Sequence, residues 1–392
     1  MRKFLILSTL LSSLLWAEKF DYKGNIGFES SHINHDINNK RDTQNALRGE
    51  FGFKESIGES TELIFNAKVI YDSADHERRY IEIEDLYYKY AFKEADLLIG
   101  RNTRFWGAME FYNLVDTFNS KDYRDDPLDY DAKLGAWNIA YTYYFDNSEL
   151  ALIAKARQED QKIQDSRSIL NILPQNYNDQ LLTQEGRNHP TVYLKYSGSG
   201  EELQIDYALI YQNGYDQQRY LIPVGTQLHQ YAYIVNRIMG YSTLIVGDTL
   251  YKSEVAYTKS DDEHVSDYAQ GSIGLEHTLY GFIGKADLGL IAEYYRYKRF
   301  EDEKLGAQAF GNLFDNDVAL GFRVTLNDTK DSDILGGVVI DQNNQERLYS
   351  IEYNTRLDNQ YKLKLSAEHL APQEDSLFYE LDRFKVEFGY YF

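Results

Sequence analysis

The stretch from Gly100 to Pro127 combines charged side chains of both signs with large apolar ones. Its charged residues are Arg101, Arg104, Glu110, Asp116, Lys121, Asp122, Arg124, Asp125 and Asp126, and its apolar residues include Phe105, Trp106, Phe111, Tyr112, Leu114, Val115 and Phe118. A segment with both kinds must pack one face on protein and keep the other in water. Charges of both signs in a narrow aqueous passage can select ions and small polar solutes.

Enzymatic and metal-binding patterns are weak in comparison. The eight His residues are scattered, no G-x-S-x-G or H-E-x-x-H motif is present, and the chain has no Cys. We therefore predict no catalytic residue, no metal site and no cofactor. Acidic runs expected in loops, such as Asp261-Asp262-Glu263 and Glu301-Asp302-Glu303, offer oxygen ligands for divalent cations, although solvated loop charge is the simpler interpretation.

The composition excludes several classes of protein. The chain has 392 residues with a formal net charge of −21 and a mean hydropathy of −0.55, which argues against a helical membrane protein and against nucleic acid as a partner. Residues 1–17 place Arg2 and Lys3 before the apolar run Phe4–Leu15, and a small residue, Ala17, precedes Glu18. This arrangement predicts a secretory signal peptide, whose removal would change the formal charge to −23.

Residues 18–392 read as a succession of segments that alternate apolar and polar side chains. Most have room for the 9–11 residues that cross a bilayer as a tilted strand. We count 18 such strands, with 16 as the alternative, joined by short and long connections in turn. In the strand Tyr80–Phe92 the alternation changes phase, which predicts a bulge near Glu84–Asp85. The fold class is therefore all-β: one transmembrane, antiparallel, up-and-down β-barrel domain.

The last strand, FKVEFGYYF, places Phe384, Val386, Phe388, Tyr390 and Phe392 on one face. A chain that ends on an aromatic residue in such a strand resembles the bacterial outer-membrane barrels. This resemblance implies assembly through the barrel-assembly machinery by way of Phe392. It also implies an outer-membrane location in a Gram-negative cell, contact with the lipid bilayer and lipopolysaccharide, and a homotrimer as one expected assembly.

The opening stretch lies between the fifth and sixth predicted strands. General porins carry at that place a third loop that folds inward and narrows the channel. Gly100-Arg101, Trp106-Gly107, Asn113, Asp116 and Asn119 resemble the G-R-x(4)-W-G…N-x(2)-D-x(2)-N pattern of a porin-like proteobacterial outer-membrane group. The resemblance implies an inward-folded loop at about 102–130. Its predicted constriction residues are Arg101, Arg104, Trp106, Glu110, Asp116, Asp122, Arg124, Asp125 and Asp126.

The strand faces opposite the apolar ones should line the lumen, because a charge on the lipid face costs about 2–4 kcal/mol at the bilayer midplane. The inward set contains 11 basic and 10 acidic side chains. The wall residues that we single out are Glu254, Glu276, Glu293, Arg323, Lys362, Lys364 and Lys385.

These observations predict a porin-like channel for passive diffusion of small hydrophilic solutes or ions, weakly cation-preferring and without enzymatic activity. The constriction would be the Trp106–Pro127 loop, where Arg101, Arg104, Glu110 and Asp116 make a transverse field. One alternative is a barrel for surface-polymer attachment or adhesion, with its long loops as the working surface. A hydrolase is a further alternative, with His264 and His277 as the residues to test.

Overall fold

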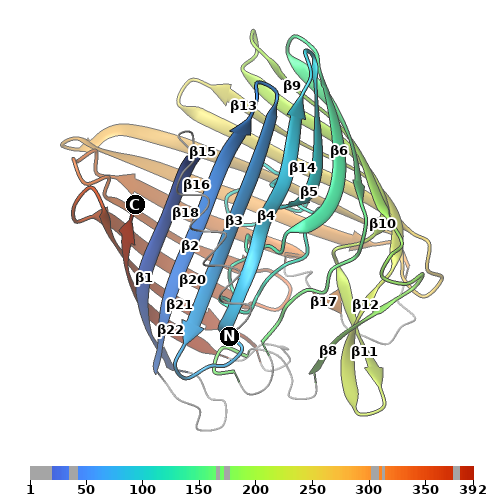
Figure 1. Cartoon of the computed structure of the whole chain (residues 1–392). Helices are drawn as coiled ribbons and strands as arrows, with labels where there is room; N and C mark the ends of the chain where they lie inside the picture. Colours follow the sequence, from blue (N-terminus) through green and yellow to red (C-terminus); the bar gives the residue numbers. More distant parts are fainter. Residues whose placement is uncertain are drawn as a thin grey trace, which may run out of the picture.

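A computed structural model shows the protein as a closed antiparallel β-barrel of 18 strands (Figure 1). The structure describes residues 20–34, 43–164, 168–171, 177–301, 309–310, 314–373 and 380–392. The predicted signal peptide, residues 1–17, lies outside the described residues. The expected strand number of 18 is confirmed, and the alternative of 16 is not.

The barrel strands follow one another around the wall in chain order. They are β1 (Phe20–Asn34), β2 (Thr43–Ile57), β3 (Thr61–Asp72), β4 (Arg79–Ala91), β5 (Ala95–Asn102), β6 (Ala136–Tyr144), β7 (Ser148–Lys155), β9 (Thr191–Gly200), β10 (Ile205–Tyr215), β13 (Ile234–Val246), β14 (Thr249–Ser260), β15 (Tyr268–Ile283), β16 (Ala286–Arg299), β18 (Asn316–Thr325), β19 (Asp333–Asp341), β20 (Arg347–Arg356), β21 (Tyr361–Ala371) and β22 (Leu381–Tyr391).

The barrel closes where β22 pairs with β1. The register runs from Asn25 opposite Tyr391 to Asn34 opposite Asp382, and Gly24 and Phe392 exchange two backbone hydrogen bonds of 3.0 Å. Closure satisfies the backbone of both edge strands, which a sheet facing lipid requires.

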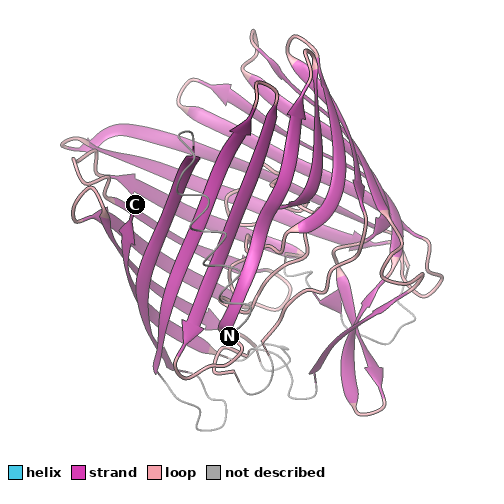
Figure 2. Cartoon of the chain, viewed as in Figure 1, coloured by secondary structure: helices cyan, strands magenta, loops and turns pink. Residues whose placement is uncertain are grey.

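The side chains of the strands alternate between a polar inner face and an apolar outer face. On β14, Glu254 is buried inside the barrel while its neighbour Val255 is 61% exposed on the outside. Figure 2 shows that strands make up nearly all of the wall. Among the described residues, no helix is long and apolar enough to cross a bilayer.

Short and long connections lie at opposite ends of the barrel, which we call the turn end and the loop end. A second sheet of four strands forms in the long connections: β8 (Tyr177–Thr183), β11 (Arg219–Val224), β12 (Gln227–Ala232) and β17 (Ala309–Phe310). The β11–β12 hairpin projects beyond the loop end (Figure 1). The sequence reading did not anticipate this sheet.

The predicted bulge lies in β4. Asn66 of β3 pairs with Asp85, and the next residue, Ala67, pairs with Ile83, so Glu84 is the extra residue. The bulge turns the side chains of β4 by one position, which accounts for the change of phase in the alternation.

Candidate pore constriction

The connection between β5 and β6, residues 103–135, folds into the barrel and packs on its inner wall; we call it the third loop. Trp106 and Phe118 lie against each other, with ring centroids 5.8 Å apart, and both contact Tyr193 of β9 at 5.2 and 5.6 Å. These rings belong to a buried cluster with inward side chains of β7, β10, β13 and β14. The aromatic residues therefore fix the first part of the loop to the wall.

Two wall carboxylates hold the middle of the third loop through its backbone. Glu254 accepts hydrogen bonds from the backbone N–H groups of Ala108 at 2.6 Å, Met109 at 3.4 Å and Val115 at 3.3 Å. Glu293 accepts from the N–H groups of Glu110 at 2.8 Å and Phe111 at 3.2 Å. Loop amides therefore take the place of water around both carboxylates, which are 2% and 3% exposed.

Residues of the G-R-x(4)-W-G…N-x(2)-D-x(2)-N pattern form contacts within the third loop that fix its backbone. Gly107 has φ of +145°, and a Cβ there would lie 2.1 Å from Oδ1 of Asn113. That same oxygen accepts the N–H of Met109 at 2.9 Å. Asn119 accepts the N–H of Arg104 at 2.8 Å and donates to the carbonyl of Leu134 at 2.8 Å. Contacts within the loop thus explain why Gly stands at position 107 and Asn at positions 113 and 119.

Asp116 is enclosed within the loop and does not face water. Its carboxylate lies 2.5 Å from Nζ of Lys133 and 3.6 Å from Nζ of Lys121.

Arg104 packs over the ring of Phe118, 5.2 Å from the centroid, and donates to Asn138 at 3.2 Å. Burial lowers the pKa of Arg104 to about 10, so it remains a cation at neutral pH.

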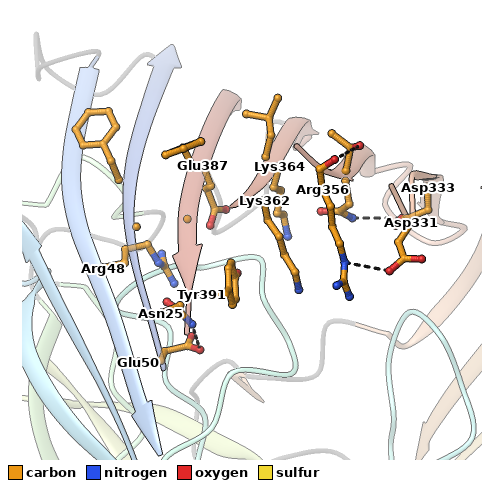
Figure 3. Close-up of a pocket in the computed structure, with 17 residues that line it drawn as sticks. Asn25, Arg48, Glu50, Asp331, Asp333, Arg356, Lys362, Lys364, Glu387 and Tyr391 are labelled. Carbon is orange, nitrogen blue, oxygen red and sulfur yellow. Dashed lines mark hydrogen bonds and ion pairs between the residues drawn. The ribbon is translucent and has the colours of Figure 1, made fainter. Parts of the chain in front are cut away.

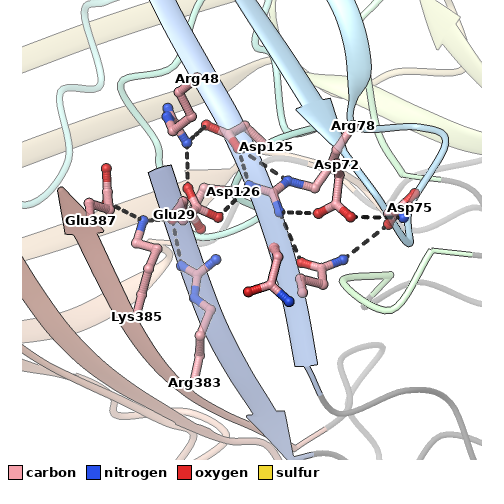
Figure 4. A network of polar contacts seen from close by, with 12 residues as sticks. Glu29, Arg48, Asp72, Asp75, Arg78, Asp125, Asp126, Arg383, Lys385 and Glu387 are labelled. Carbon is pink, nitrogen blue, oxygen red and sulfur yellow. Dashed lines mark hydrogen bonds and ion pairs between the residues drawn. The ribbon is translucent and has the colours of Figure 1, made fainter. Parts of the chain in front are cut away.

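The last part of the third loop reaches the opposite side of the barrel (Figure 4). Asp125 lies 2.7 Å from the guanidinium of Arg48 on β2 and 2.8 Å from that of Arg78, which precedes β4. Asp126 lies 2.5 Å from Arg383 and 3.7 Å from Lys385, both on β22. We call these two aspartates and four cations the crossing network.

Glu29 of β1 links the two arginines of the crossing network, at 2.6 Å from Arg48 and 2.5 Å from Arg78. Burial alone would raise the pKa of Asp125, but Arg48 and Arg78 hold it below its usual range. Burial is likewise outweighed at Asp126, whose pKa is lowered by Arg383 and Lys385. The network therefore keeps both aspartates ionised where the loop meets the far wall.

Arg124 and Arg101 extend the crossing network along β4. Arg124 lies 2.8 Å from the buried Asp122 and 3.1 Å from Glu82, and Arg101 lies 2.6 Å from the same Glu82. Glu82 of β4 thus pairs with one arginine on β5, just before the third loop, and with one arginine of the loop itself.

Apolar residues cover the crossing network toward the loop end. Ile169 and Leu170, from the connection between β7 and β9, pack with a set of side chains from the third loop and the neighbouring wall. That set consists of Ile33, Leu128, Leu348, Leu370 and Leu381. The hydroxyl of Ser168 donates a hydrogen bond to Asp75 beside them.

Toward the turn end the lumen is open and polar (Figure 3). A cavity of about 420 Å³ is lined by Arg48, Glu50, Lys362, Lys364 and Glu387, among other residues. A second cavity, of about 680 Å³, continues past Asn66 and Glu84. Lys364 lies 2.6 Å from Glu352, and Lys385 lies 3.1 Å from Glu387. The third loop thus separates a tightly packed side of the lumen from an open, polar one.

Comparisons with solved structures agree with this architecture. OprB of Pseudomonas putida matches with a TM-score of 0.52 and 11% identity over 98% of this chain and 96% of that chain. OccD3 of Pseudomonas aeruginosa matches with a TM-score of 0.59 and 9% identity, over 96% and 92% of the two chains. OccAB4 of Acinetobacter baumannii matches with a TM-score of 0.55 and 11% identity, over 96% and 99%.

The fold is that of the outer-membrane porins. No protein-family model matches the sequence, and no curated protein matches it. The porin fold and the closed barrel support an outer-membrane location.

Within this porin fold, the predicted constriction residues fall into three settings. Trp106, Asp116 and Asp122 are buried inside the packed loop, and Arg104 packs there over Phe118. Arg101, Arg124, Asp125 and Asp126 lie on the crossing side, whereas Glu110 lies on the other wall, paired with Arg323. Arg101, Arg104, Glu110 and Asp116 therefore do not face one another across a single opening.

The predicted wall residues also separate. Glu254 and Glu293 are covered by the third loop, because their carboxylates accept its N–H groups. Glu276 lies 3.6 Å from Arg323, beside Glu110. Lys362 and Lys364 line the open cavity toward the turn end, whereas Lys385 belongs to the crossing network and also pairs with Glu387.

Sequence reasoning missed Arg78 and Arg383 as partners of the loop aspartates. Arg383 shares a strand face with Lys385, two residues away, so its inward direction was readable from the alternation. Arg78 lies in a loop, where no periodicity indicates direction. Its contacts follow only from the closure of β1 and β2 beside β22.

Proposed function

We propose that this protein is an outer-membrane channel for passive diffusion of small hydrophilic solutes or ions. The observation that carries the proposal is the course of the third loop, which is anchored to one wall and reaches the opposite one through Asp125 and Asp126. This course narrows the lumen, and on its turn-end side open cavities remain beside β20–β22 and β1–β4. The polar cavities between the third loop and the turn end hold charges of both signs, as a water-filled pore requires.

We assign the constriction to the third loop with the crossing network as its selective part. Arg101 and Arg124 share Glu82 beside the crossing network, and Glu110 narrows the lumen from the other wall, where it pairs with Arg323. Trp106 and Asp116 hold the loop in shape. These roles extend the predicted constriction to Arg48, Arg78, Arg383 and Lys385.

A weak cation preference remains part of the proposal. The net charge of −21 attracts cations to the mouths, whereas most charges of the crossing network are paired with opposite ones. Solvent-exposed charge is screened within about 10 Å at 0.1 M salt. Reversal potentials across a salt gradient should therefore show cation preference near 0.05 M that fades near 1 M.

Conductance in planar bilayers tests the channel directly. Deleting Ala108 to Arg124 should raise single-channel conductance severalfold, because the segment fills part of the lumen, while the barrel still assembles. Shortening the β11–β12 hairpin tip at residues 223–227 is the matched control and should leave conductance unchanged. Absence of conductance in the intact protein, or no change on the deletion, would refute the proposal.

Surface-polymer attachment or adhesion is the second candidate function, and the projecting sheet of β8, β11, β12 and β17 favours it. Loss of polymer binding in the hairpin variant, with conductance retained, would support this role. A hydrolase has no comparable support, since His264 precedes β15 at the loop end whereas His277 lies on β15 opposite Thr249, toward the turn end. Contacts with lipopolysaccharide and the assembly machinery, and a homotrimeric state, remain predictions.

A further inference from the structure

A cavity of about 220 Å³ lies in the lumen between the third loop and β19–β21. Phe111 and Tyr130 of the third loop and Phe314, which precedes β18, form one side of it. Leu335, Val339 and Leu348 of the wall form another. The cavity lies on the same strands as the polar cavity of Figure 3, but nearer the loop end, since Glu352 and Lys364 lie between them.

An apolar surface that stays accessible from the lumen differs from the rest of this wall. The two larger cavities are lined mainly by charged and amide side chains, and the inward apolar side chains of β7, β10, β13 and β14 are buried under the third loop. Here Leu335, Val339 and Leu348 point inward and are only partly buried. The third loop seals the neighbouring surface, where the ring of Phe111 lies over Gly337 and a Cβ would come within 2.7 Å of it. The loop covers the glycine but leaves the adjacent apolar side chains accessible.

The cavity has the size and lining of a site for a small ring. A cavity of about 150 Å³ lined by apolar side chains is large enough to bind benzene. Burial of a ring against Phe111, Leu335 and Val339 would remove apolar surface of both partners from water. Ligand sites of this kind typically add a few polar groups that fix orientation.

Three carboxylates supply those polar groups. Glu110, Glu352 and Glu368 line the cavity, and among the described residues that line it there is no Lys or Arg. Their cationic partners, Arg323, Lys364 and Arg383, contact them from outside the lining. The side of these carboxylates that faces the cavity therefore favours a positively charged donor.

We propose that this cavity binds small solutes that combine an apolar ring with a protonated amine, as a station on the way through the pore. The ring would lie against Leu335, Val339 and Phe111, and the ammonium group would donate to Glu352 or Glu368. The proposal rests on the proposed channel function and names a solute class for it. Moving from Glu352 toward the turn end, a solute would next meet Lys364 and the polar cavity of about 420 Å³.

Benzylammonium is the probe that joins both features, and two controls remove one each. Ethanolammonium keeps the amine without the ring, and benzoate keeps the ring with the opposite charge. Added to single channels in KCl, benzylammonium should cause brief blockades at concentrations at least about tenfold below those at which either control does so. Equal blockade by ethanolammonium, or stronger blockade by benzoate, would overturn the proposal.

Two substitutions locate the effect. Leu335→Asn should weaken benzylammonium blockade about five- to tenfold, because it replaces apolar surface by an amide. Leu335→Met is the matched control and should retain the blockade. Ser350→Phe should weaken the blockade as well, because Ser350 lines the cavity and the added ring would occupy it. Blockade unchanged in both Leu335→Asn and Ser350→Phe would place the block elsewhere and refute this site.

Conduction and binding can fail separately. Single-channel conductance in KCl, recorded before any probe is added, reports on the channel itself. Calorimetric titration of benzylammonium into the detergent-solubilised protein reports on the cavity without requiring conduction. A conducting channel with no preferential benzylammonium binding refutes only this inference. A non-conducting protein that binds benzylammonium refutes only the proposed function.

Discussion

The two sides of the barrel lumen use the same residue type for different purposes. On the covered side, β6 to β18, Glu254 and Glu293 accept backbone N–H groups of the third loop and lose contact with water. On the open side, β20–β22 and β1–β4, Glu352 and Glu387 pair with Lys364 and Lys385 near an open, polar cavity. A charged wall position is therefore either an anchor or part of a pore, depending on what lies opposite it.

The comparison shows how a loop can be held firmly inside a water-filled barrel. Five N–H groups of the loop donate to two carboxylates, and apolar rings seal the contact from water. Hydrogen bonds to a charged group are stronger than those between neutral groups, and the low local dielectric strengthens them further. In the crossing network, ion pairs instead of backbone hydrogen bonds hold the loop, at the edge of the open side.

The largest effect should come from removing the anchors. Replacing both Glu254 and Glu293 by Ala leaves the N–H groups of Ala108, Glu110, Phe111 and Val115 without these acceptors, whereas Met109 still donates to Asn113. Each buried group left unpaired costs about 1–3 kcal/mol. The loop should detach from the wall and expose Lys121 and Lys133, which are 8% and 9% exposed in the native state. Limited trypsin digestion followed by mass spectrometry detects cleavage at these lysines.

Glu387→Gln on the open side is the control for the anchor variant and should remain resistant at Lys121 and Lys133. Resistance of the double Ala variant equal to that of the native protein would show that aromatic packing alone holds the loop, and the contrast between the two sides would lose its basis.

A smaller effect is expected from neutralising the crossing network. Asp125→Asn with Asp126→Asn removes two negative charges beside Arg48, Arg78, Arg383 and Lys385. The passage should then favour anions, with the cation-to-anion permeability ratio falling by about twofold or more. Reversal potentials in a KCl gradient measure the ratio. Asp116→Asn is the matched control, because Asp116 is enclosed by Lys121 and Lys133. The amide oxygen of Asn can still accept from both lysines, so the loop should keep its shape and the permeability ratio should not change.

The smallest effect should be that of pH on the crossing network. The pKa values of Asp125 and Asp126 lie below the ordinary value near 3.9 because cations surround them. A depressed folded-state pKa keeps these charges, and the stability they contribute, at every pH above the ordinary value; both are lost only as pH falls through the lowered pKa. The difference in reversal potential between the native protein and the Asp125→Asn, Asp126→Asn variant should therefore stay constant from pH 8 to about pH 5.

A difference that changes with a midpoint near pH 6 would contradict this prediction for the crossing network. It would mean that burial outweighs the arginines and that the aspartates are partly protonated in the folded protein.

The sequence by itself determined the barrel and its number of strands, because side-chain alternation is a local property that each strand carries independently. It also located the bulge near Glu84–Asp85, since one extra residue changes the phase of the pattern; the structure identifies Glu84 as that residue. It identified the third loop, because a long segment rich in both rings and charges has few places where it can pack. Trp106 as a wall anchor follows from the same reasoning.

Only the tertiary structure decided which charges meet. Glu254 and Glu387 are equivalent by alternation, but the loop covers one and leaves the other in water. Asp126 and Arg383 are 257 residues apart in sequence, and they approach because β22 closes onto β1. Such partnerships depend on loop course and barrel closure, which are non-local, whereas the alternation that places a side chain inward is fixed by the strand itself.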